Sequence, residues 1–291
     1  MSNDDGILAS LRYLFEDIIG EEHDTPPFLP EGLPEAAALA VSDGIHLLTE
    51  YQGTSYAQLY VDRVCRFVGR LGNDGRTLCD IARLMAMRMA YEDPIRIAQF
   101  KLMELANGRP PSVEVRKFRI DELIGALPAI AGEPMLDALD MIGWRHRRIS
   151  IRFSNASWIG IRRLKLEAAL KRWRLFSIRY AEERAWVERW LHMISRALVK
   201  QPQAVPAIID SANMITGHGD PYRHGLADWH AIIDGLAKPT FDGALPLADL
   251  AGAMTEARAA AEPDRQQVAL KRAIARIRAR TLGEAAVAAL G

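Results

Sequence analysis

Cysteine is scarce in this sequence, whose 291 residues include only Cys65 and Cys79. An iron–sulfur cluster needs about four cysteine ligands, and the spacing of this pair fits neither a CxxC redox motif nor a zinc ribbon. We therefore interpret both residues as reduced thiols on helices. The chain alone is expected to bind no cofactor.

The sequence also lacks a long apolar run and a basic start. No segment approaches the roughly 20 apolar residues that span a bilayer, and MSNDDGILAS at the N-terminus does not follow the signal-peptide pattern. The formal net charge is zero, so the overall charge predicts no attraction to nucleic acid or to a membrane surface. We expect a cytoplasmic protein with neither kind of partner.

Common enzyme motifs are missing as well. The sequence contains no GxGxxG after a predicted strand, no Walker A motif, no GxSxG and no HExxH. Its composition, 49% apolar and 25% charged, is that of an ordinary globular protein. Motifs and composition together therefore indicate a globular chain without indicating a reaction.

What the sequence does have is an uneven distribution of charge. Residues 1–50 contain eleven Asp and Glu but one basic residue, Arg12, whereas residues 145–184 contain twelve Lys and Arg against three Glu. Such segments can pair with each other or dock on other subunits. Nucleic-acid binding by the basic segment is the alternative. The neutral total and the helical spacing of the aromatic residues in that segment disfavour it.

Helical periodicity dominates the chain, and we predict a mainly α, multi-helix domain. Two stretches, 112–120 and 147–155, instead alternate polar residues with β-branched or aromatic ones, which predicts strands. The segment between them is helical in pattern. We therefore expect a small β element, such as a hairpin-like pair, inside the helical protein.

Prolines mark the expected domain organisation. Four of them lie between residues 21 and 34 and predict an irregular linker, so residues 1–33 are expected to form an acidic N-terminal arm and linker. Residues 34–291 are expected to form a single helical domain. A proline-marked loop near Pro246 begins its C-terminal part, in which we predict the helices of residues 246–291.

Residues 159–200 have one long helical pattern, for which a break is predicted near residues 176–181. Aromatic and aliphatic residues recur along it at three- and four-residue steps, which predicts a buried stripe. The residues of the stripe are Trp173, Phe176, Tyr180, Trp186, Trp190, Ile194 and Leu198.

The stretch richest in chemically active residues is GHGDPYRHG, residues 217–225. His218, His224 and His230 fall six residues apart along this region. Zinc ligands on one helix are usually three or four residues apart, so we expect no metal here.

Two other interpretations of this stretch remain. As an anion site, Gly217 and Gly219 would adopt positive φ, their amides would form a nest, and Arg223 would add charge. As a shaped connection between helices, Gly217 would cap the preceding helix, Asp220 would make an Asx-type turn and Pro221 would stop continuation. The residues alone favour the connection.

Four stretches in order resemble the C-terminal helical region of the indolepyruvate oxidoreductase beta-subunit family. The resemblance covers about residues 34–233, and four blocks in the right order are more specific than any one of them. The blocks are LTEYQGTSYAQLYVDRV (48–64), LMAMRMAYEDPIRIAQFK (84–101), RLKLEAALKRWRLFSIRYAEERAWVERWL (163–191) and ANMITGHGDPYRHGLADW (212–229).

The resemblance implies a role in oxidative decarboxylation of arylpyruvates. In that family the alpha subunit carries thiamine diphosphate and the iron–sulfur clusters, and the beta subunit begins with a catalytic-type domain that has no counterpart here. The implied function is therefore a helical accessory subunit or domain of a thiamine-dependent 2-oxoacid oxidoreductase. It would support assembly or the substrate or acyl site, and would not be redox-active alone.

In the fourth block, Gly217, Gly219, Asp220 and Gly225 match the family's glycine-rich turn. His218 stands where the family commonly has an aromatic residue, and Pro221-Tyr222 replaces its Thr-His pair. The frame is kept while the side chains vary, which favours a turn of required backbone geometry over a catalytic constellation.

We assign no catalytic residue and expect two contact surfaces, the basic helix 162–179 and the loop 217–225. The expected partner is the thiamine and iron–sulfur subunit or a second copy of this chain. The alternative is a protein that binds a small anionic ligand, such as a coenzyme A ester or a carboxylate. A third interpretation has the acidic arm occupying the chain's own basic groove. The candidate ligand or interface residues are Gly217, His218, Gly219, Asp220, Arg223, His224, Tyr51, Gln52, Arg163 and Arg172.

Overall fold

The structure is a computed structural model that describes residues 26–71, 75–217, 219–261 and 266–288. Most of the predicted acidic arm lies outside these ranges, as does His218. The described chain is mainly helical with one two-stranded antiparallel sheet, which confirms the predicted fold class. No helix in the described ranges combines the length and the apolar character needed to cross a membrane.

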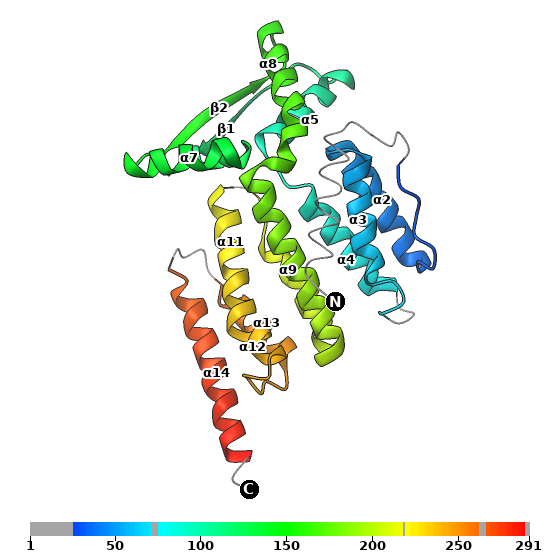
Figure 1. The fold of residues 1–291 in the computed structure, drawn as a ribbon, viewed down its shortest axis with the longest axis vertical. Helices are drawn as coiled ribbons and strands as arrows, with labels where there is room; N and C mark the ends of the chain where they lie inside the picture. Colours follow the sequence, from blue (N-terminus) through cyan, green and yellow to red (C-terminus); the bar gives the residue numbers. More distant parts are fainter. Residues whose placement is uncertain (1–25, 72–74, 218, 262–265, 289–291) are drawn as a thin grey trace.

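The helices begin and end close to where the sequence pattern predicts (Figure 1). Gly53 separates the first two, and the side chain of Asp93 caps the helix starting at Pro94 by accepting a hydrogen bond from the backbone N of Arg96 (2.6 Å). The helices are α2 (Glu35–Tyr51), α3 (Thr54–Cys65), α4 (Gly75–Met89), α5 (Pro94–Ala106), α6 (Ile120–Gly125), α7 (Ala129–Met141), α8 (Trp158–Ala169), α9 (Ile178–Lys200), α10 (Val205–Asp210), α11 (Gly219–Ile232), α12 (Lys238–Phe241), α13 (Leu250–Ala259) and α14 (Val268–Ala288). Three 3₁₀ segments, η1 (Leu170–Phe176), η2 (Pro202–Ala204) and η3 (Ser211–Met214), and the π-helical segment η4 (Ile233–Ala237) connect some of them.

Most of the core belongs to one helical body, which we define as α2–α4 and α9–α14. In Figure 1 the long α9 runs through its middle, with α2–α4 on one side and α11–α14 on the other. Trp186 and Trp229 meet edge to face with ring centroids 5.8 Å apart. The indole N–H of Trp190, which is fully buried, donates to the carbonyl of Ile208 (3.0 Å). Large aromatic side chains therefore hold α9 against the C-terminal helices.

A second, smaller unit, which we call the hairpin module, comprises α5, β1 (Val113–Arg119), α6, α7, β2 (Arg148–Ser154) and α8. The strands pair antiparallel with Arg116 opposite Ile151, which confirms the predicted pair of strands. The module's own cluster of buried apolar residues is small. It consists of Ile97, Ala98, Phe118, Phe153 and Leu164.

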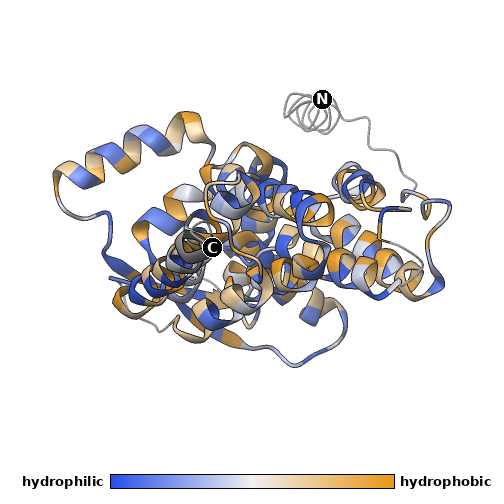
Figure 2. Cartoon of the chain, turned by 90° about the horizontal axis from the view of Figure 1, so that it is seen from below, coloured by the Kyte–Doolittle hydropathy of each residue, from blue (hydrophilic) through white to orange (hydrophobic). Residues whose placement is uncertain are grey.

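Much of the hairpin module's apolar surface is left exposed. Only Gly132 is buried on α7 and only Leu164 on α8. In Figure 2, α7 is the helix that stands apart from the body, and it carries apolar residues along its length. Residues 94–169, the module with its connecting segments, contain 12 of the 22 exposed large apolar side chains in the described ranges, a surface of the kind that marks interaction sites.

The predicted break in the long helical pattern is confirmed, but the predicted stripe is only partly right. Ser177 ends η1 and caps α9, its hydroxyl accepting from the backbone N of Tyr180 (3.1 Å). Trp173 and Phe176 are 56% and 36% exposed rather than buried. The 3₁₀ turn of η1 has about three residues per turn, so it breaks the register of the stripe and places Arg174 in the interior instead.

Candidate functional site

Two arginines, Arg174 and the half-buried Arg179, contact residues from all four of the stretches singled out in the sequence. The first is Arg174, whose guanidinium forms a two-point ion pair with Asp93 (Nε–Oδ2 2.7 Å, Nη2–Oδ1 3.0 Å). Its Nη1 also donates to the carbonyl of Tyr51 and to Oε1 of Gln52, both at 3.0 Å. This one side chain therefore ties the first, second and third stretches together.

The contacts of Tyr51 and Gln52 assign them a structural role. The hydroxyl of Tyr51 donates to the carbonyl of Tyr91 (3.1 Å), and the guanidinium of Arg174 lies over its ring. The amide of Gln52 donates to the carbonyl of Lys171 (2.9 Å). Burial opposes the charge of Arg174, but the neighbouring Tyr51 and Asp93 raise its pKa. Neither candidate residue is accessible to a ligand, since both are buried.

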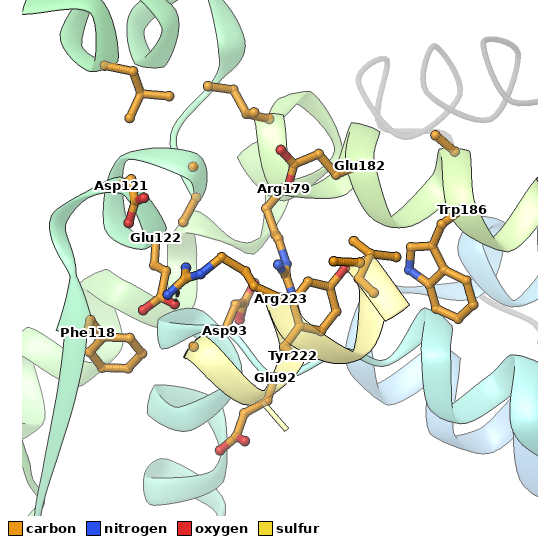
Figure 3. Close-up of a pocket in the computed structure, with 18 of the residues that line it drawn as sticks. Glu92, Asp93, Phe118, Asp121, Glu122, Arg179, Glu182, Trp186, Tyr222 and Arg223 are labelled. Atoms are coloured by element: carbon orange, nitrogen blue, oxygen red, sulfur yellow. Dashed lines mark hydrogen bonds and ion pairs between the residues drawn. The ribbon is translucent and has the colours of Figure 1, made fainter. Parts of the chain in front are cut away.

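The second arginine, Arg179, extends the cluster to the fourth stretch. Its guanidinium stacks on the ring of Tyr222, 3.6 Å from the centroid, and lies 5.7 Å from that of Tyr91. Its Nη2 is 2.7 Å from Oε1 of Glu183. Figure 3 shows Arg179 reaching from α9 toward Tyr222, with Arg223 beside it on α11.

Glu183 is the most deeply buried carboxyl group of the cluster. The indole N–H of Trp186 donates to its Oε2 (2.6 Å). Burial raises the pKa of Glu183, although Arg179 opposes the shift. The buried hydroxyl of Tyr222 interacts with this carboxyl group, and together with burial the interaction raises the pKa of Tyr222.

A cavity of about 790 Å³ lies over this cluster. The hairpin module contributes α6, α7 and the start of α5 to its lining, and the body contributes α9 and α11. Its volume falls in the range of about 300–1,000 Å³ typical of small-molecule sites. Apolar lining residues include Phe118, Leu136, Ile178, Trp186 and Leu226.

Charged side chains of both signs line the same cavity, and most are paired. Arg223 donates to Oε1 of Glu122 (2.8 Å) across it. Glu182 makes no hydrogen bond or ion pair with any described residue, and Arg145 pairs with Asp140 through Nη1 while its buried Nε has no partner among those residues. Burial raises the pKa of Glu182, against the effect of Arg179 and Arg145.

The stretch 217–225 begins a helix rather than forming a loop, which corrects part of the prediction. Gly217 and Gly219 have φ of 71° and 72°, as predicted. Gly217 does not cap η3, which ends at Met214, and Pro221 lies inside the first turn of α11 instead of stopping a helix. Proline is well accepted in a first turn, where its missing N–H removes no helical hydrogen bond.

A close backbone approach explains another glycine of this stretch. A Cβ on Gly225 would come within 2.0 Å of the carbonyl oxygen of Met214. Only glycine therefore lets α11 pack directly against the segment that precedes it.

Asp220 attaches α11 to the hairpin module. Its carboxylate accepts from Arg223 (2.8 Å), forms an ion pair with Arg148 and lies 3.6 Å from Arg119. The hydrogen bond from Arg223 lowers the pKa of Asp220 to about 2. Asp220 and Arg223 are thus occupied by each other and by module residues, so this stretch offers an anion little free positive charge.

The remaining candidates lie apart from the cavity lining. Arg163 is exposed and pairs with Glu167 on α8 (2.7 Å), Arg172 is exposed on η1, and His224 is half-buried on α11. No group of three or more side chains suited to a metal ion occurs among the described residues.

Residues 37–235 match a protein family described as a family of unknown function, DUF6537. The chain belongs to this family. The DUF6537 match includes the whole hairpin module and both walls of the cavity. No curated protein and no solved structure matches the chain.

Sequence reasoning missed the cavity-lining residues Arg145, Arg179 and Glu182, and the buried residues Arg174 and Glu183 beside them. One signal for the two glutamates was available. They are two of the three acidic residues in the basic segment 145–184, and an adjacent acidic pair on a basic helix requires arginine partners or a ligand.

Proposed function

We propose that this DUF6537 chain is a helical accessory subunit or domain that docks on the thiamine- and iron–sulfur-carrying subunit of a cytoplasmic 2-oxoacid oxidoreductase. The observation that carries the proposal is the exposed apolar and basic face of α8. The ordered resemblance to indolepyruvate oxidoreductase beta subunits supports the choice of partner. The redox cofactors would then reside on that partner.

The exposed residues of the α8 face recur at the spacing expected for a helix that packs on another protein. Ile159, Arg162 and Leu166 follow one another at three- and four-residue steps, and all three are exposed. The guanidinium of Arg162 covers the exposed ring of Trp158, 4.3 Å from its centroid. Tryptophan and arginine side chains provide much of the binding energy in protein interfaces.

The charge of this face indicates the chemistry of the partner. Arg162, Arg163 and Lys165 are exposed on α8 alongside the apolar residues, and Glu167 is the only acidic residue of the helix. An apolar surface edged with acidic residues is complementary to it. A second copy of this chain is the competing occupant, and a binding experiment distinguishes the two.

A pair of matched leucines tests the α8 face. Leu166 on α8 is 69% exposed and Leu39 on α2 is 71% exposed, so neither Leu166→Glu nor Leu39→Glu disturbs a core. The tagged chain is mixed anaerobically with extract of its source organism, and the captured material is assayed for thiamine diphosphate and iron. We expect Leu166→Glu to weaken capture at least about tenfold, corresponding to about 1.4 kcal/mol, and Leu39→Glu to leave it unchanged.

Two results contradict the proposal. One is captured material without thiamine diphosphate and iron, including self-association alone. The other is the absence of a difference between the two leucine variants, because unchanged capture by Leu166→Glu would place the contact outside the α8 face and equal loss for both would show that the effect is not specific to it.

A second candidate function, small-molecule binding, is favoured by the cavity. The predicted anion site at 217–225 has little free charge, since Asp220 and Arg223 are paired. The arginines that line the cavity are the better location for a ligand, and the structure allows the ligand's class to be narrowed.

A further inference from the structure

We propose that the cavity between the hairpin module and the body binds a zwitterion of the α-amino acid type with a large apolar side chain. The proposal concerns a different surface from the α8 face and does not depend on the docking role. It rests on three features of the lining: unused arginine donors, an unpaired carboxylate and apolar walls.

The arginines offer hydrogen-bond donors to the carboxylate of the ligand. Arg179 makes one ion pair, with Glu183 (2.7 Å), while its guanidinium has five N–H donors. The Nε of Arg145 is buried and has no hydrogen-bond partner among the described residues. Guanidinium groups bind carboxylates through two parallel hydrogen bonds, so these donors can take a carboxylate that the protein itself does not supply.

Glu182 offers a carboxylate with which the ammonium group of the ligand can form an ion pair. It projects from α9 one residue before Glu183 and three residues after Arg179, and it lines the same cavity. Arg179 is one helical turn before it on α9, and Arg145 lines the same cavity, so one small molecule in the cavity can contact both kinds of anchor. No described residue forms an ion pair or hydrogen bond with Glu182.

The apolar residues of the cavity walls can pack against an apolar side chain of the ligand. Phe118, Leu136, Ile178 and Trp186 line the cavity, and Figure 3 shows Phe118 and Trp186 at opposite ends of it. Tyr222, which is 96% buried, lines the cavity between these walls, with its hydroxyl beside the carboxyl group of Glu183. A ligand polar at one end and apolar at the other satisfies all of these groups.

The balance of charge excludes simpler ligands. The lining contains Arg145, Arg179, Arg189 and Arg223, but also five carboxylate side chains, including Glu182 and Glu122. An anion alone would face the unpaired Glu182, and a cation alone would face unpaired arginine donors. A zwitterion meets both, and each charge-assisted hydrogen bond contributes about 1.5–3 kcal/mol.

Three ligands with the same ring test the proposal by calorimetric titration of the full chain. L-Phenylalanine carries both charges, 3-phenylpropionate lacks the ammonium group and 2-phenylethylamine lacks the carboxylate. We expect the amino acid to bind at least about tenfold more tightly than either analogue. L-Leucine and L-tryptophan extend the series if the cavity prefers another side chain.

Variants assign the two ends of the ligand. Glu182→Gln should weaken amino-acid binding about tenfold without weakening 3-phenylpropionate binding, and Arg145→Gln should weaken both. Glu31→Gln, the same change at an exposed residue before α2, should alter neither. Because Glu182 is exposed and Arg145 is half-exposed, neither variant is expected to unfold the chain.

Several outcomes overturn the proposal. Equal affinity for 3-phenylpropionate, or tighter binding of phenylpyruvate or acetyl-coenzyme A, would make this an anion site. Equal affinity for 2-phenylethylamine would make it a cation site. Absence of binding by all three amino acids up to about 10 mM would show that the cavity takes no ligand of this class.

Discussion

The helical body and the hairpin module differ in how they are stabilised. The body buries tyrosine, phenylalanine and tryptophan rings from helices far apart in the sequence, whereas the module's cluster has five buried residues. Many large apolar side chains of the module are exposed, whereas most of those in the body are buried. The contrast indicates that the body is the more stable unit. Under the proposed docking role, a partner would cover the apolar side chains that the module exposes. The cavity lies where the two meet.

Two tryptophans, one in each unit, offer the strongest test of this contrast. Trp190 in the body is fully buried, and Trp158 in the module is 66% exposed. We expect Trp190→Ala to lower the free energy of unfolding by about 3–5 kcal/mol, because it removes a large core side chain. Trp158→Ala should change it by less than about 0.5 kcal/mol. Urea denaturation followed by circular dichroism measures both.

A large effect at Trp158 would contradict the contrast, since it would mean that the exposed face of α8 stabilises the isolated chain. Partner binding, unlike stability, should be sensitive to the exposed tryptophan. Trp158→Ala should weaken capture of the partner, although it leaves the fold intact.

The same contrast explains how far the sequence could predict the structure. Periodicity predicted the helices, the pair of strands and the break before α9, because these depend on local patterns. The burial of Trp173 was predicted wrongly because a short 3₁₀ segment changes which side chains face the core. No local sequence pattern indicated this 3₁₀ segment. Pro221 was read as a stop signal although a first helical turn accepts proline equally well.

The cavity was beyond prediction for a different reason. It combines Arg145 from the module, Glu182 from α9 and Tyr222 from α11, which meet only through tertiary packing. Tyr51 and Gln52 were singled out within a resembling stretch, but their role in binding Arg174 depends on a residue more than 120 positions away. Sequence patterns identify such residues as unusual without showing what they contact.

The next test removes the module's core. Phe153 is 1% exposed and meets Phe118 edge to face at 6.2 Å. Phe153→Ala should lower the opening free energy of the module by about 3 kcal/mol. Hydrogen exchange should then show faster exchange in residues 94–169, with α9 still protected. The drop in global stability should be smaller than for Trp190→Ala, because the module opens locally before the body unfolds.

A uniform rise in exchange over the whole chain would show that module and body unfold as one unit. Val113→Ala is a control in the same hairpin, because that side chain is 45% exposed. It should leave exchange in the module nearly unchanged.

The smallest expected effect concerns the attachment of module to body through Asp220. Arg223 holds the pKa of this carboxyl group at about 2 in the folded chain, below the value near 4 of an unfolded aspartate. A lowered folded pKa gives stability that is fully present above about pH 4 and is lost as pH falls through about 2. Since Arg148 is 60% exposed, screening limits this contribution to about 1 kcal/mol or less.

Asp220→Asn should therefore lower stability slightly at neutral pH and flatten the acid limb of the stability curve. Asp43→Asn, at an exposed position on α2, should leave both unchanged. Thermal denaturation from pH 7 to pH 2 measures the difference between these variants and the parent chain. If the acid limb of Asp220→Asn follows the parent, the ion pairs of Asp220 do not help to join the module to the body, and the joint depends on other contacts, such as those of Arg223 with Glu122 and of Arg96 with Glu50.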